Sequence, residues 1–175
     1  DELMAWFNRL IGTGKRRIIT LSLLGVLLLG GAVMFWADHE PDQFDVIAVA
    51  EARAVINNHE IRTGYVTTST LIEVVDTMLS KRGGYLYNDV LPPFVFMDNI
   101  PAWEVGVIFQ ARDLARSLRN DFSRSQTQSA EDADLAKADP QFSFDYGSWI
   151  LPSTEGEYRK GIRALESYLD RLGNQ

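Results

Sequence analysis

Few side chains in this chain have the type and setting of a reactive site, and Glu104 is one of them. It follows Trp103 near the expected start of a helix, where an aromatic neighbour would desolvate the carboxyl group and raise its pKa. Such a carboxyl group can serve as the acid of a hydrolase or lyase that acts on a cell-wall polymer. The alternative is a first-turn glutamate that the helix dipole stabilises. The sequence context favours this second interpretation.

A second candidate is a row of arginines on the helix that follows Glu104. Their spacing of i, i+4 and i+7 places them on one face, and an acidic segment follows along the chain. The acidic segment can fold back and form solvated ion pairs of little net stability. The arginines can instead bind an acidic partner, a lipid headgroup or an anionic glycan. The arginines are Arg112, Arg116 and Arg119, with Arg124 just beyond, and the acids are Glu131, Asp132, Asp134 and Asp139.

Other reactive chemistry has little support in the sequence. The two histidines, His39 and His59, lack a carboxylate at a ligand-like spacing, so we expect both to be solvated. The chain has no cysteine, which excludes disulfides and thiolate metal ligands. No nucleotide-binding loop, zinc-protease motif or nucleophile elbow occurs. We therefore expect no metal and no cofactor.

The segment 18–36 predicts a transmembrane helix. Its 19 residues contain no charge, and at helical rise they extend about 28 Å, close to the thickness of a bilayer core. Basic residues precede it and acidic residues follow, which puts the N-terminus in the cytoplasm and the rest of the chain outside. A cleaved signal peptide is the alternative, but no typical cleavage site follows the run. The flanking residues are Lys15, Arg16 and Arg17 on one side and Asp38, His39 and Glu40 on the other.

The parts on either side of this span differ in charge. Residues 1–17 are basic and amphipathic, so we expect them to lie on the cytoplasmic surface, with Lys15, Arg16 and Arg17 near anionic lipid. Residues 38–175 carry 13 basic and 22 acidic side chains, a net charge of −9. Such an acidic domain repels phosphate backbones, so we exclude nucleic acid as a partner.

Beyond a linker at 37–44, the periodicity predicts an all-α domain over 45–175. Helices are expected to begin near Asp42 or Asp45, at 67–70, at Asp98 or Asn99, and at Thr154 with a capping box. An aromatic loop over 85–98 is interrupted by two prolines. The polar segment 120–142 is expected to be a long surface loop, held at both ends and available for a partner. The fold class is thus all-α, with one transmembrane helix followed by a helical bundle outside the cytoplasm that carries long aromatic and polar loops.

Three stretches resemble an uncharacterised Gram-negative family known as domain of unknown function 2333. They are "GYVTTSTLIEVVDTMLSKRGGYLYNDVLPP", "MDNIPAWEVGVIFQARDLARSLRNDFSRSQ" and "SWILPSTEGEYRKGIRALESYLDRL". Phe94 stands where the family pattern has glycine, a local departure. The resemblance implies a single-span inner-membrane protein, and the greater length of its members implies that a C-terminal part is missing here. It implies no activity, catalytic residue or cofactor.

These observations favour a non-catalytic protein of the bacterial inner membrane with a periplasmic domain. We expect it to bind an envelope protein, or another copy of itself, as an accessory subunit of an envelope assembly. The alternatives are a cell-wall enzyme that uses Glu104 and a lipid- or glycan-binding module that uses the arginines.

Overall fold

The computed structural model describes residues 5–6, 14–122 and 131–174. The described part is helical, as expected, and contains no strand. Most of the predicted amphipathic segment at 1–17, and Arg124, lie outside the described residues. The apolar helix α2 (Lys15–Ala37) is long and apolar enough to cross a membrane, and its flanks extend the predicted span by a few residues. An anchor and a signal sequence both satisfy that test.

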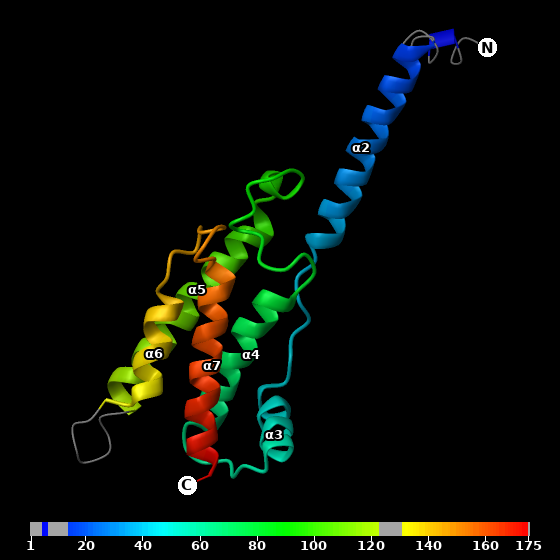
Figure 1. Cartoon of the computed structure of the whole chain (residues 1–175). Helices are drawn as coiled ribbons and strands as arrows, with labels where there is room; N and C mark the ends of the chain where they lie inside the picture. The colour runs from blue at the N-terminus through cyan, green and yellow to red at the C-terminus, as the bar shows by residue number, and fades with distance from the viewer. Residues whose placement is uncertain (1–4, 7–13, 123–130, 175) are drawn as a thin grey trace.

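Four helices form an antiparallel bundle in which each runs opposite to the next (Figure 1). They pack in the cyclic order α4, α5, α6 and α7, and a shorter helix, α3 (Val46–Asn57), packs on the outside of α4. The 3-10 helix η1 (Phe94–Phe96) lies in the loop before α5, and the π-helix η2 (Leu118–Phe122) follows α5. The bundle helices are α4 (Tyr65–Ser80), α5 (Asn99–Ser117), α6 (Ala133–Phe142) and α7 (Thr154–Gly173).

Two apolar clusters hold the domain together. The larger one fills the bundle with aliphatic and aromatic side chains from all four helices, including Tyr65, Leu71, Phe142 and Leu165. The smaller one joins the end of α2 to the domain through Ala37, Leu86 and Ile100. Ala37 is fully buried, so the expected linker begins only after it. This contact fixes α2 at one end of the bundle.

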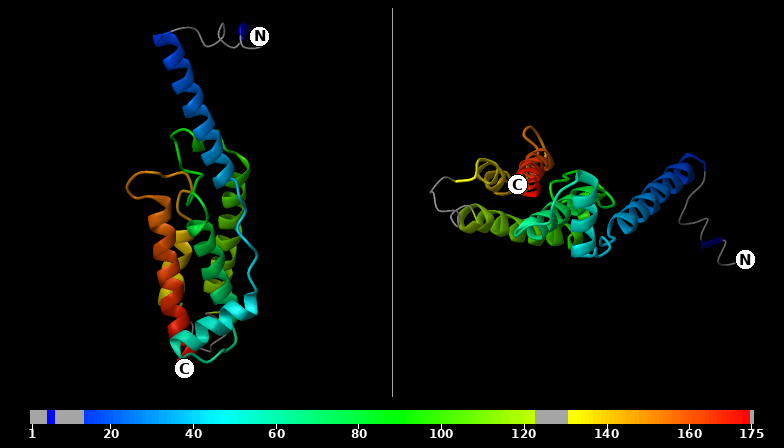
Figure 2. Two further views of the ribbon diagram at one scale, coloured as in Figure 1. Left: turned by 90° about the vertical axis from the view of Figure 1, so that its right-hand side faces the viewer. Right: turned by 90° about the horizontal axis from the view of Figure 1, so that it is seen from below.

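The antiparallel topology sorts the loops between two ends of the domain. The α4–α5 loop (81–98) and the α6–α7 loop (143–153) lie at the end from which α2 departs (Figures 1 and 2). Helix α3 and the C-terminus of α7 lie at the opposite end, where Glu60 N–H donates to Gly173 O. We call these the α2 end and the far end.

The expectation of one continuous loop over 120–142 is wrong at both of its ends. Residues up to Phe122 continue α5 as η2, and Ala133–Phe142 form helix α6. The Asp132 carboxylate accepts from the N–H groups of Asp134 and Leu135, which starts α6 as a cap. Polar residues and Pro140 gave this segment the composition of a loop. Its buried apolar face is short, and consists of Leu135, Ala138 and Phe142.

Helix boundaries and faces also differ from expectation in detail. Asp45 caps α3 as predicted, but α4 begins at Tyr65, before the proposed threonine caps. Ser153 caps α7, while the Thr154 hydroxyl donates to Asp145 O, 2.7 Å away. In α5 the buried face includes a charged side chain. The buried residues are Ile100, Pro101, Glu104, Ile108, Ala111 and Ala115, and Leu118 follows them.

Gly161 allows α6 and α7 to approach closely, and its replacement provides a test of the fold. A Cβ there would lie 2.7 Å from the Phe142 ring, whereas a Cβ at Gly106 on α5 would meet nothing. We expect Gly161→Ala to lower the free energy of unfolding by about 1–2 kcal/mol, because overpacking outweighs the gain in helix propensity. Gly106→Ala is the control and should raise it by about 0.5–1 kcal/mol. Denaturant unfolding of both variants in detergent makes the comparison; equal stabilisation by both would contradict the packing.

Candidate functional site

A buried ion pair between Lys81 and Glu104 lies at the α2 end of the bundle. Lys81 caps the C-terminus of α4, and Glu104 lies in the second turn of α5. Lys81 Nζ is 2.5 Å from Glu104 Oε1, and the side chains are 1% and 0% exposed. Lys81 also donates to Gly84 O, 2.5 Å away. Two charges removed from water in this way are stable only if their remaining hydrogen-bonding capacity is satisfied.

The loop between the two helices supplies the other partners of Glu104. The N–H of Leu86 lies 2.9 and 3.0 Å from the two carboxylate oxygens, and the N–H of Tyr87 donates to Oε2 at 2.8 Å. The loop reaches this position because Gly83 and Gly84 both adopt positive φ, at 81° and 75°. The carboxylate therefore organises the loop backbone as well as neutralising Lys81.

Electrostatics at Glu104 combine opposing effects. Burial raises the pKa of the Glu104 carboxyl, while Lys81 and the two N–H groups act in the opposite direction. Burial also raises the pKa of Asp89, assisted by the nearby charge of Glu155. A raised pKa is a property of general acids. The Glu104 side chain is, however, fully enclosed by its partners and has no surface to offer a polymer.

The same network joins the two loops at the α2 end. Tyr85 Oη donates to Tyr146 O at 2.9 Å, and Asn88 Nδ2 donates to Ser148 O at 2.9 Å and to Glu155 Oε2 at 3.0 Å. The rings of Tyr87 and Tyr146 also meet edge to face, with centroids 5.0 Å apart. Residues 81–88 thus act as a bridge between the ion pair and the α6–α7 loop.

Sequence reasoning selected Glu104 but missed Lys81. The two residues are 23 positions apart, and nothing in "SKRGG" marks Lys81 as a buried partner. One feature of the sequence could have indicated a buried charge partner. Glu104 lies one helical turn before Ile108, on the buried side of α5. A charged residue on a core face requires an opposite charge, although its identity follows only from the fold.

The structure places two of the predicted arginines, Arg116 and Arg119, against α6. Arg119 pairs with Glu131 and, at 2.9 Å, with Asp139, while Arg116 lies 3.7 Å from the same aspartate. Arg112 lies over the Phe109 ring at 4.8 Å and contacts Asp113. The other two acids, Asp132 and Asp134, pair with Arg171 on α7. The acidic segment therefore holds α6 to α5 and α7 through partly exposed pairs.

The expectation of two solvated histidines is wrong for His59. Its side chain is 3% exposed, Nδ1 lies 3.1 Å from Tyr65 Oη, and Nε2 lies 3.6 Å from Asp170. Gly173 packs against the ring so closely that a Cβ there would overlap it. His59 thus joins the start of α4 to the end of α7. Among the described residues, no group of three or more acidic or histidine side chains is arranged to hold a metal ion.

The family model for "Uncharacterized protein conserved in bacteria (DUF2333)" matches residues 11–175. The chain belongs to this family. The match covers α2 and every bundle helix, so the ion pair and both loops at the α2 end lie within the family region. No curated protein and no solved structure matches the chain.

The ion pair makes a specific prediction about stability. Lys81→Met should lower the free energy of unfolding by about 3–5 kcal/mol, because it leaves a buried carboxylate without its counter-charge. The exposed pair between Arg62 and Glu60 is the matched control, and Arg62→Met should cost less than about 1 kcal/mol. Chemical denaturation in detergent gives both values. Similar small losses for the two variants would show that Lys81 does not hold Glu104.

Buried tyrosines beside this site predict a loss of stability at high pH. Burial raises the pKa of Tyr85 and of Tyr158 above the ordinary 10.0. Since the unfolded chain ionises first, their contribution is complete below pH 10 and is lost as the pH rises above it. Melting temperatures measured from pH 8 to beyond 10 should therefore fall. Tyr158→Phe should make the fall shallower, whereas Tyr87→Phe, at an exposed ring, should leave its slope unchanged.

Proposed function

We propose that this protein is a non-catalytic, membrane-anchored accessory subunit whose helical domain binds another protein outside the cytoplasm. The observation that carries this proposal is the outer face of α3. That helix buries only Ala50 and Ala54 against the domain. Much of its remaining surface is apolar and open to solvent, with Val55 80% and Ile56 81% exposed, although Glu51 is also exposed on it. An exposed apolar patch on a helix is normally a site of interaction.

The exposed surface has the spacing of a helix-binding site. Ala48, Ala52, Val55 and Ile56 follow one another at i, i+4, i+7 and i+8 on the outer side of α3. Beside them a shallow groove runs between α3 and α4, with Val49, Ala52 and Ile56 on its apolar side and the ion pair of Arg53 with Glu73 across it. We call this surface the α3 face. Amphipathic helices bind to such grooves through their apolar side.

The position of the α3 face argues for a protein as its occupant. It lies at the far end, away from α2, so a bilayer crossed by α2 would not reach it (Figure 1). The domain has a net charge of −9 over residues 38–175, from 13 basic and 22 acidic side chains. A second acidic copy would be repelled. A different protein with basic residues beside an apolar helix face fits this surface best.

The proposal also includes the location of the domain, in the periplasm of a bacterial cell. Lys15, Arg16 and Arg17 precede the apolar part of α2, and Asp38 and Glu40 follow it, which favours a cytoplasmic N-terminus and a periplasmic domain in the inner membrane. Helix α2 exposes its apolar side chains on all sides, as a retained anchor in lipid would. Membership of a family conserved in bacteria is consistent with this location.

The enzyme and anion-binding alternatives receive less support. Glu104 is enclosed by Lys81 and two backbone N–H groups, and Arg116 and Arg119 both pair with Asp139 of α6. Contacts within the domain therefore occupy the carboxylate of Glu104 and two of the arginines that a substrate or ligand would need.

A photocrosslinking amino acid at Ile56 in the full-length chain tests the proposal in native membranes. We expect one defined adduct with another protein, and none from the same probe at Glu166 on α7. Val55→Asp should abolish the adduct, while stability changes by no more than about 0.5 kcal/mol because the site is exposed. A crosslink between two copies of the chain would mean that the α3 face binds a second copy and not a different protein. Absence of any adduct at Ile56 would contradict the role of the α3 face.

A further inference from the structure

We propose that the two loops at the α2 end insert into the outer leaflet of the bilayer that α2 crosses, so that the domain is embedded in the membrane surface. This inference rests on the proposed anchoring role of α2. The exposed side chains of the loops motivate it, since Phe96 is 71% and Leu151 94% exposed. Neighbouring exposed apolar residues in the same loops are Val90, Leu91, Val95, Trp149 and Ile150.

The α4–α5 loop lies beside the apolar part of α2. A Cβ placed on Gly30 would be 3.8 Å from Pro93 Cβ. Gly30 precedes the helix end at Ala37 by seven residues, and at helical rise this separation is about 10 Å. With the bilayer surface at the Ala37 end of α2, Pro93 lies below that surface, near the roughly 5–10 Å depth of interfacial apolar groups.

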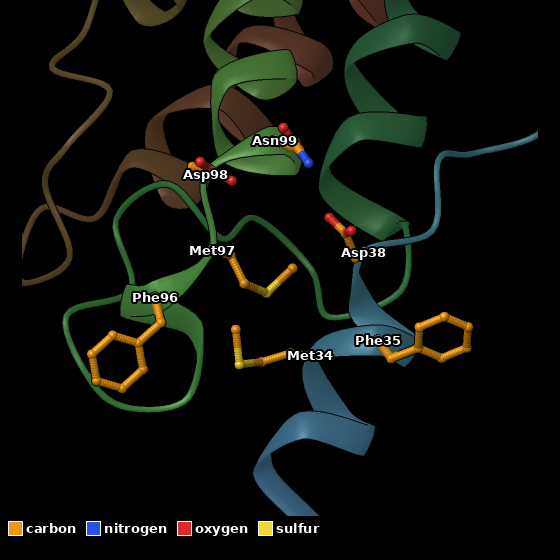
Figure 3. Close-up of a pocket in the computed structure, with 7 residues that line it drawn as sticks. All are labelled: Met34, Phe35, Asp38, Phe96, Met97, Asp98 and Asn99. Atoms are coloured by element: carbon orange, nitrogen blue, oxygen red, sulfur yellow. The ribbon is translucent and has the colours of Figure 1, made fainter.

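Side chains between α2 and η1 extend the apolar surface without forming a ligand site. Met34 of α2 and Met97 after η1 point toward one another, whereas Phe35 points away on the other side of α2 (Figure 3). The cavity here is about 150 Å³, smaller than the roughly 300–1,000 Å³ of small-molecule sites. Asp38, Asp98 and Asn99 line its other side. This polarity matches a boundary between acyl chains and headgroups.

The backbone from Pro92 to Met97 is largely suited to an apolar medium, because five of these six residues have no N–H or pair it within the loop. Pro92 and Pro93 have no N–H to satisfy. The N–H groups of Val95, Phe96 and Met97 donate to carbonyls within the loop, at 3.3, 3.1 and 2.9 Å. Backbone donors without a partner cost several kcal/mol in hydrocarbon, so a loop that enters lipid must pair them internally.

The second loop strengthens the argument because the topology places it at the same end. Trp149, Ile150 and Leu151 form a short apolar run beside Tyr146 and Ser148, which the ion-pair network ties to the first loop. Trp149 is the residue type that favours the headgroup region. Two loops and one helix thus give three points of membrane contact, which determine the tilt of the bundle.

The absence of cysteine allows a direct test in the full-length chain. Single cysteines at Phe96, Leu151, Val26 and Ser167 would each carry an environment-sensitive fluorophore, in phosphatidylethanolamine–phosphatidylglycerol vesicles containing nitroxide-labelled lipids. We expect nitroxides on the acyl chains to remove most of the emission at Phe96 and those near the headgroup to remove it at Leu151. The label at Ser167, exposed on α7, should keep its emission.

The label at Val26 in α2 separates the two proposals. Deep quenching at Val26 with none at Phe96 or Leu151 would leave the anchor intact and overturn loop insertion. No quenching at Val26 would refute the anchor itself. A blue-shifted emission at Phe96 that lipid nitroxides do not quench would mean that protein covers the loop, which also overturns the proposal.

Discussion

The ion pair between Lys81 and Glu104 is the interaction on which the α2 end of this structure depends. One carboxylate binds the end of α4 through Lys81 and holds the following loop through the N–H groups of Leu86 and Tyr87. Leu86 then packs with Ala37, which fixes α2 to the bundle. Removal of either charge would leave the other buried without compensation, so the pair is required once the loop has closed around it.

The rest of the surface can be understood from this fixed end. Because neighbouring helices are antiparallel, successive loops lie at opposite ends of the bundle. The two apolar loops, α4–α5 and α6–α7, therefore both lie next to α2. The sequence between η2 and α6 contains the polar run "SRSQTQSA". The sides of the bundle carry charged pairs such as Arg119 with Asp139. On the proposed anchoring, this distribution points the α3 face into the extracytoplasmic space, where a partner protein can reach it.

Sequence periodicity was sufficient for the helical class, the apolar span and most helices, because long amphipathic patterns have few alternative structures. It failed for α6, whose ten residues include Pro140 and only a short buried face. It also failed for His59, because the glycine that packs on its ring, Gly173, lies over a hundred residues away. Glu104 could be selected as unusual, but Lys81 could not, since a buried pair is defined by helix packing and not by local sequence.

A fully buried carboxylate can be an acid held ready for catalysis or an acceptor needed by the backbone, and its neighbours decide between these roles. A catalytic acid needs at least one oxygen that faces a substrate. Both oxygens of Glu104 face donors of the protein, and two of those donors belong to a loop beside the end of α2. Near lipid, water is scarce and the loop N–H groups need acceptors supplied by the chain. On the proposed embedding, Glu104 supplies the acceptor at the base of the loop and the 3-10 turn of η1 supplies those at its tip. The same environment that makes Glu104 resemble a catalytic residue therefore favours a structural role at a membrane surface.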